Sequence, residues 1–131
     1  MRNVTIAAFC ALASIAFTTP SWAQDKAQDI SQQQLMVDRF AAQPMQLLDV
    51  RSSDEYQQGH IKGAMNISFD VLADHLEQLD KDRPIVVYCR SGRRAGKAID
   101  TLLQNGFTQV YHLEGDMNGW QEQKLPQISQ P

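Results

Sequence analysis

The sequence has few cysteines, no excess of positive charge and no apolar run of membrane-spanning length. Two cysteines among 131 residues cannot build a disulfide scaffold. There are 12 Lys and Arg against 15 Asp and Glu, and the net charge of −3 argues against a general nucleic-acid binder, which would carry a basic face. Hydrophobic residues at 43% and charged residues at 21% lie near globular averages, which argues against wholesale disorder. These limits leave one small globular domain.

The longest apolar run, at Val4–Phe17, is 14 residues long. A helix needs roughly 20 residues to cross the hydrocarbon layer, so this run is too short to span a membrane. Arg2 precedes the run, and Ser21 and Ala23 place small residues at the −3 and −1 positions of a cleavage site. The pattern predicts a secretory signal peptide at 1–23, with export to a bacterial periplasm and no membrane attachment after cleavage. A buried amino-terminal helix is the alternative.

Cleavage of this leader would remove one of the two cysteines. Cys10 lies inside the apolar run, so Cys89 would be the single cysteine of the mature chain. A secreted domain with one cysteine has no internal disulfide, and its thiol is either buried or reactive. Cys89 is therefore the first candidate for a functional residue.

Residues 31–123 alternate between strand and helix patterns, between a polar linker predicted at 24–30 and a flexible tail predicted at 124–131. The run at 85–88 is continuously apolar, as in strands that are buried on both faces of a parallel sheet. The alternation predicts one α/β domain with an open, mostly parallel sheet. Strands are expected at 46–50, 64–67, 85–88 and 110–113, helices at 31–42, 53–58, 94–105 and 117–121, and a helical stripe at Phe69, Leu72, Leu76 and Leu79.

Local signals mark several of the expected helix ends. Ser31 and Ser52 are each followed three residues later by Gln or Glu, the pattern of a capping box at a helix start. Gly59 and Gly106 stand where a glycine would end a helix. Trp120 lies on the last expected helix, which would turn it inward.

The segment after the apolar strand carries the candidate chemistry. Ligands of open α/β folds gather beyond the carboxyl ends of the strands, and Cys89 lies there, directly before the helix expected at 94–105. A helix amino terminus stabilises an anion, and Gly92 permits a left-handed backbone that curls the amides around one atom. These features favour thiolate over thiol and fit an anionic substrate. The loop reads Cys89-Arg90-Ser91-Gly92-Arg93-Arg94, with three arginines beside the thiol.

This loop resembles the active-site loop of the rhodanese sulfurtransferases, and a second segment, from Leu48 to Ile67, resembles the other signature of that family. The two lie in the family's order, and the resemblance covers nearly all of 31–121. It implies a rhodanese-like fold, an open and mostly parallel sheet with helices on both faces. Small, single-domain, exported members of the phage-shock type are the nearest in form, and a monomer is expected.

The resemblance also implies an activity, that of a thiosulfate sulfurtransferase. The thiolate would take the outer sulfur of thiosulfate, release sulfite, and pass the persulfide sulfur to cyanide or a thiol. No metal or organic cofactor is needed, because the cysteine carries the transferred group. The catalytic residue would be Cys89, and the substrate-binding residues would be Arg90, Ser91, Gly92, Arg93 and Arg94.

Several other polar residues have simpler interpretations. Asp49 and Arg51 could include a general base, but a structural role is favoured for both. Glu55 is interpreted as a helix-capping partner and His60 as a hydrogen-bonded loop anchor. A metal site is not expected, because no ligand spacing relates the three histidines, His60, His75 and His112.

Four alternatives compete with a thiosulfate sulfurtransferase. Phosphatases of the Cdc25 type resemble the same fold, but their loop is one residue longer than the six residues from Cys89 to Arg94. The shorter loop suits one sulfur atom better than a tetrahedral phosphate. An arsenate reductase would need an outside thiol to reset its lone cysteine. A non-catalytic binding module usually lacks the cysteine or the loop glycine, whereas a sulfur-relay protein would share the persulfide and differ in its acceptor.

Overall fold

The computed structural model describes residues 26–129. The leader predicted at 1–23 lies outside these residues. Within them, no helix has both the length and the apolar character needed to cross a membrane.

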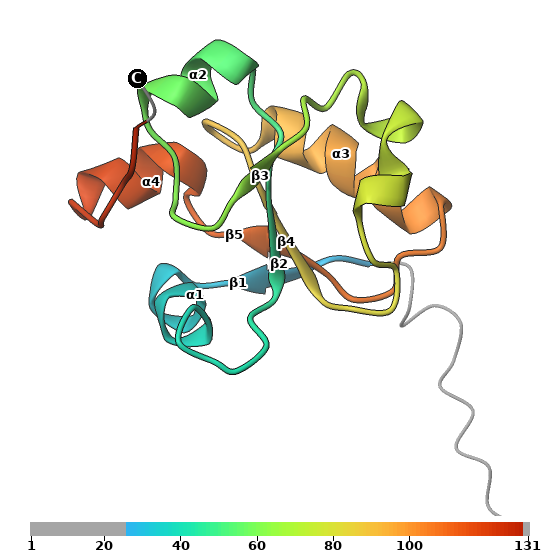
Figure 1. The fold of residues 1–131 in the computed structure, drawn as a ribbon, viewed down its shortest axis with the longest axis horizontal. Coiled ribbons are helices and arrows are strands. Elements are labelled where there is room, and N and C mark those ends of the chain that lie inside the picture. Colours follow the sequence, from blue (N-terminus) through green and yellow to red (C-terminus); the bar gives the residue numbers. More distant parts are fainter. Residues whose placement is uncertain (1–25, 130–131) are drawn as a thin grey trace, which may run out of the picture.

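Five parallel strands form one sheet in the order β1-β5-β4-β2-β3 (Figure 1). The central strand β4 (Ile85–Tyr88) is buried at all four positions, as its continuous apolar sequence predicts. The predicted α/β class with a parallel sheet is therefore confirmed. The other strands are β1 (Gln28–Ile30), β2 (Gln46–Asp49), β3 (Met65–Asn66) and β5 (Val110–Leu113).

Helices cover both faces of this sheet, and successive side chains of β4 point to opposite faces. Ile85 and Val87 pack in one core cluster with apolar residues of α3 (Arg93–Gln104). Val86 and Tyr88 pack in a second cluster with residues of α1 (Gln32–Asp38) and α4 (Asp116–Glu122). The remaining elements are α2 (Ser53–Gln58), η2 (Leu72–Asp74) and η3 (Leu76–Gln78).

The capping signals act as the sequence predicts. Ser31 caps α1 and Ser52 caps α2, each in a complete capping box. Gly59 ends α2, and Gly106 follows α3 with a φ of +88°, a left-handed conformation that glycine adopts without strain. Trp120 is 3% exposed, so α4 turns it inward as expected.

Helix α1 is shorter than predicted, because it ends at Asp38 rather than near Ala42. The Asp38 carboxylate accepts the backbone N–H of Met45 at 3.0 Å, and Arg39 donates to the Met45 carbonyl. These bonds fold the chain back toward β2. Phe40 is 89% exposed, so no burial of that side chain favours a longer helix.

The polar segment at 24–30 was expected to be a linker, but its last three residues form β1. This strand pairs in parallel with β5, with Gln28 opposite Tyr111 and Ile30 opposite Leu113. Ile30 is its one buried residue, so the strand carries almost no sequence pattern of its own. The strand forms because its backbone pairs with that of β5.

The stripe of Phe69, Leu72, Leu76 and Leu79 does face the core, but not as one helix. Leu72 is fully buried, and the other three pack partly buried against the same core cluster. The backbone forms two separate 3₁₀ turns, η2 and η3, broken at His75. The apolar spacing thus predicts the buried side of this segment, but the single helix that it predicts is wrong.

The carboxyl-terminal tail also differs from expectation, since it is fixed to the domain through Ile128. The backbones of His60 and Ile128 exchange two hydrogen bonds of 2.9 Å. The indole N–H of Trp120 donates to the Pro126 carbonyl at 2.9 Å, and Leu125 packs against the second core cluster. The tail thus closes over the end of α4.

Candidate active site

Cys89 lies directly after β4, where the loop that leads into α3 begins. Cys89 is 1% exposed, and its Sγ accepts a hydrogen bond from the backbone N–H of Gly92 at 3.0 Å. Gly92 is the N-cap of α3 and has a φ of +111°, the left-handed conformation that the sequence predicts. The loop therefore curls an amide onto the sulfur at the amino terminus of a 12-residue helix, an arrangement that stabilises negative charge on sulfur.

The start of α4 holds the peptide groups of this loop. The Asp116 carboxylate accepts the N–H of Cys89 at 3.0 Å, and the Met117 N–H donates to the Cys89 carbonyl at 2.9 Å. The next amide, of Asn118, donates to the Arg90 carbonyl at 3.0 Å. Both backbone groups of Cys89 are thus bound by consecutive residues, which fixes the direction of its side chain.

Sequence reasoning missed the pair formed by His112 and Asp116. His112 Nε2 lies 3.0 Å from both carboxylate oxygens of Asp116, and Nδ1 lies 3.8 Å from Asp29. The hydrogen bond to Asp116 raises the pKa of His112 above its ordinary value. A signal was available, because His112 lies in β5 beside β4, and the carboxyl ends of parallel strands meet at one sheet edge.

The three loop arginines do not form one uniform group. Arg90 and Arg93 are exposed, whereas Arg94 is half-buried and paired with Glu55 through contacts of 2.6 and 3.0 Å. This pairing lowers the pKa of Glu55 to about 2 and raises that of Arg94. Two of the three positive charges thus face solvent, and the third is balanced by a carboxylate.

Glu55 does more than cap a helix. It completes the capping box at Ser52, as predicted, and its carboxylate also joins α2 to the first turn of α3 through Arg94. The capping pattern is local in sequence, whereas the contact with Arg94 spans 39 residues. The second role therefore had no local signal.

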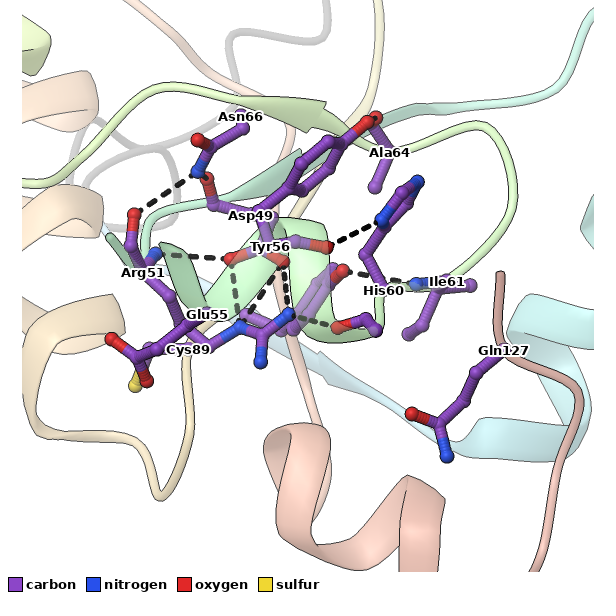
Figure 2. Close-up of polar contacts among 12 residues, drawn as sticks. Asp49, Arg51, Glu55, Tyr56, His60, Ile61, Ala64, Asn66, Cys89 and Gln127 are labelled. Atoms are coloured by element: carbon purple, nitrogen blue, oxygen red, sulfur yellow. Dashed lines mark hydrogen bonds and ion pairs between the residues drawn. The ribbon is translucent and has the colours of Figure 1, made fainter. Parts of the chain in front are cut away.

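Asp49 and Arg51 form a buried ion pair beside the loop (Figure 2). Arg51 Nη2 lies 2.6 Å from the Asp49 carboxylate and donates to the Gly59 carbonyl at 2.7 Å. The Asn66 side-chain amide donates to the backbone carbonyls of both Asp49 and Arg51. These bonds tie β2, the end of α2 and β3 together, which agrees with a structural role.

His60 is an anchor for the segment after α2. Its Nδ1 lies 2.7 Å from the Tyr56 carbonyl, and its ring stacks on that of Tyr56 with centroids 3.6 Å apart (Figure 2). The residue is 1% exposed. These contacts agree with the predicted role of His60 as a loop anchor.

A polar cavity of about 390 Å³ lies beside the cysteine loop, and its lining includes Glu55, Gln58, Arg90, Asn118 and Gln121. Arg90 follows Cys89 directly in the chain, although Cys89 itself is buried and is not part of the lining. Within residues 26–129, no group of three or more His, Cys, Asp or Glu side chains is placed to hold a metal ion.

Known proteins resemble this chain in fold and in sequence. A family model described as "Rhodanese-like domain" matches residues 31–123. The chain is 40% identical over 75 residues to the uncharacterized protein YqhL of Bacillus subtilis. The aligned region covers 57% of this chain and 60% of YqhL. It is 37% identical over 87 residues to the thiosulfate sulfurtransferase GlpE of Shewanella oneidensis, covering 66% of this chain and 86% of GlpE.

Among solved structures, a rhodanese-related protein from Thermoplasma volcanium superimposes with a TM-score of 0.69 at 28% identity. The superposition covers 77% of this chain and 97% of that one. Fold, sequence and the cysteine loop agree, and the chain belongs to the rhodanese-like domain family.

Proposed function

We propose that the protein is a sulfurtransferase that takes a sulfane sulfur from thiosulfate, or a similar donor, and carries it on Cys89. The family and the name of the GlpE relative support sulfur transfer in general. The observation that carries the proposal is the Cys89 Sγ, bound by the Gly92 N–H at the amino terminus of α3. That geometry prepares a thiolate for nucleophilic attack.

In the first step, the Cys89 thiolate attacks the outer sulfur of thiosulfate. A new S–S bond forms to Cys89 while the S–S bond of thiosulfate breaks, and its electron pair leaves with sulfite. The product is a persulfide whose outer sulfur carries negative charge. The Gly92 N–H donates to Sγ at the amino terminus of α3, and donors of this kind stabilise negative charge on sulfur as an oxyanion hole does on oxygen.

In the second step, cyanide or a thiolate attacks the outer sulfur of the persulfide. The bond to Cys89 breaks, its electron pair returns to Sγ, and thiocyanate or a new persulfide leaves. The enzyme ends as it began, so the cycle needs neither an oxidant nor a reductant. Cys89 itself carries the group between the two half-reactions.

The loop arginines supply positive charge for an anionic donor. Arg90 lines the cavity and Arg93 is exposed at the start of α3, so both are placed to attract sulfonate oxygens. Arginine binds such oxygens by paired hydrogen bonds. Arg94, oriented by Glu55, adds a fixed charge near the same helix terminus.

The experiment compares sulfur transfer with phosphate hydrolysis. We expect thiocyanate formation from thiosulfate and cyanide, and no turnover of an aryl phosphate, because the six-residue loop closes on one atom. Cys89→Ser should abolish thiocyanate formation. A protein that hydrolyses the phosphate ester and forms no thiocyanate would support the phosphatase alternative, and one inactive in both assays would favour a binding module.

The proposal extends to location, on the basis of the leader predicted at 1–23. We expect expression of the full chain in a bacterium to yield periplasmic protein whose amino terminus is Gln24. Recovery of an uncleaved chain in the cytoplasm would contradict this part of the proposal. The acceptor would then be a cytoplasmic rather than a periplasmic thiol.

A further inference from the structure

A buried carboxylate lies against the backbone of the candidate nucleophile. Asp116 is 2% exposed and accepts the Cys89 N–H at 3.0 Å. Its φ of +52° is a left-handed backbone conformation that residues other than glycine seldom adopt. A negative charge at this position opposes a thiolate on Cys89, and a buried carboxylate is costly unless it is paired. The thiolate and the buried carboxylate would therefore both be stabilised by a positively charged group beside Asp116.

His112 is that group. Its Nε2 lies 3.0 Å from each Asp116 oxygen, and its side chain is 26% exposed. The second carboxylate that faces the ring is Asp29 of β1, 3.8 Å from Nδ1 and itself 71% exposed. From the cysteine loop, the neighbour is the uncharged Gly92, where an added Cβ would lie 3.7 Å from the ring and 3.2 Å from Asp116 Oδ2. The pair thus packs directly under the loop.

We propose that Asp116 and His112 are positioning residues for Cys89: the carboxylate holds its peptide group, and the imidazolium cancels the charge that would oppose the thiolate. This inference rests on the proposed use of Cys89 as a nucleophile. It gives a role to a carboxylate and a histidine that the sulfur-transfer steps themselves do not use.

The charge on His112 then controls the reactivity of Cys89. The bond to Asp116 raises the pKa of His112, so the imidazolium persists at and above the pH where a free histidine loses its proton. Below the raised pKa the pair is neutral overall. Above it the proton is lost, and Asp116 faces the nucleophile without compensation.

The test measures how fast iodoacetamide alkylates Cys89 in the full chain between about pH 5 and pH 9, by mass spectrometry of the peptide that contains Cys89. His112→Gln keeps a hydrogen-bond donor but never carries charge. We expect Cys89 in this variant to react about threefold more slowly than wild type at neutral pH and below, with the difference disappearing at high pH. His75→Gln, at a partly exposed histidine between η2 and η3, should match wild type throughout.

A second variant, Asp116→Asn, distinguishes an effect of the His112 charge from an effect of its structural contact. Asp116→Asn keeps an acceptor for the Cys89 N–H but removes the negative charge, and it also removes the cause of the raised His112 pKa. At neutral pH and above, where His112 is then largely uncharged, adding His112→Gln should change the alkylation rate little. Equal slowing in both backgrounds, or the same ratio at every pH, would overturn the inference and indicate a merely structural contact.

The two proposals fail in different ways. If thiosulfate adds sulfur to Cys89 but alkylation does not depend on His112, the positioning role is wrong and the function stands. If alkylation depends on His112 but thiosulfate adds no sulfur, the function is wrong and the positioning role stands.

Discussion

At the scale of single residues, the site depends on one glycine that carries no reactive group. The Gly92 amide reaches Sγ because the residue has a φ of +111°. A side chain there would be strained by that backbone, and its Cβ would lie 3.2 Å from Asp116 Oδ2. The amide that prepares the thiolate therefore requires glycine at this position.

Gly92→Ala should lower the kcat/KM for sulfur transfer at least about tenfold, since one lost charge-stabilising donor commonly costs that much or more. Gly96→Ala is the matched control, because Gly96 lies in α3 with no atom within 4 Å of an added Cβ. The control should keep full activity and raise the free energy of unfolding by about 0.5–1 kcal/mol. Equal activity of both variants would remove Gly92 from the mechanism.

Arg90 provides a second test at this scale, because it lines the cavity beside the cysteine. Arg90→Ala should raise the KM for thiosulfate about tenfold and change kcat little, as expected for loss of ground-state binding. Arg83→Ala changes the net charge equally, but Arg83 lies before β4, at the opposite sheet edge, and bonds to the Pro44 carbonyl. Its KM should stay at the wild-type value, and an equal rise in both variants would point to net charge alone.

At the scale of elements, Glu55 and Arg94 link α2 to α3 beside the reactive loop. The contact is bidentate, and both side chains are partly buried, with 29% and 27% of their surface exposed. The link fixes the first turn of α3, whose N-cap supplies the amide on Sγ. Stability should therefore depend on the charge of Glu55.

The pKa of Glu55 lies near 2 in the folded protein, below its ordinary value of 4.5. A lowered carboxylate pKa stabilises the fold above the unfolded value, and that contribution is lost as the pH falls toward the folded value. Glu55→Gln should thus cost about 1 kcal/mol of unfolding free energy at neutral pH, with allowance for solvent screening. The difference from wild type should shrink between about pH 5 and pH 3, measured by urea unfolding. A difference independent of pH would exclude the ion pair as its cause.

Elements with local signals are those that sequence reasoning found. Ser52 and Glu55 predict the start of α2, and the apolar run at 85–88 predicts the buried central strand. Strand β1 could not be predicted, because only Ile30 is buried and because its pairing with β5 joins distant parts of the chain. The same limit applies to the site: the cysteine loop is contiguous, but the approach of Asp116 to Cys89 spans 27 residues.

At the scale of the whole molecule, a buried ion pair holds several segments in one arrangement. Arg51 and Asp49 are almost fully buried, and their bonds reach Gly59 and Asn66. Removing one side chain of a buried ion pair leaves the other charge buried without a partner, which lowers the free energy of unfolding. The pair is therefore expected to contribute to global stability.

Arg51→Met should lower the free energy of unfolding by about 3–5 kcal/mol, because the Asp49 carboxylate would remain buried without a partner. Urea unfolding followed by Trp fluorescence measures the loss. Arg83→Met, at an exposed arginine, should change stability by less than about 0.5 kcal/mol. Similar values for the two variants would show that the buried pair does not stabilise the fold.

The most direct test of the account is the intact mass of the protein after incubation with thiosulfate. We predict an increase of one sulfur atom per chain, located on Cys89, absent from Cys89→Ser and removed again by cyanide. An unchanged mass, or an added sulfur that persists in Cys89→Ser, would contradict the claim that Cys89 carries the transferred sulfur.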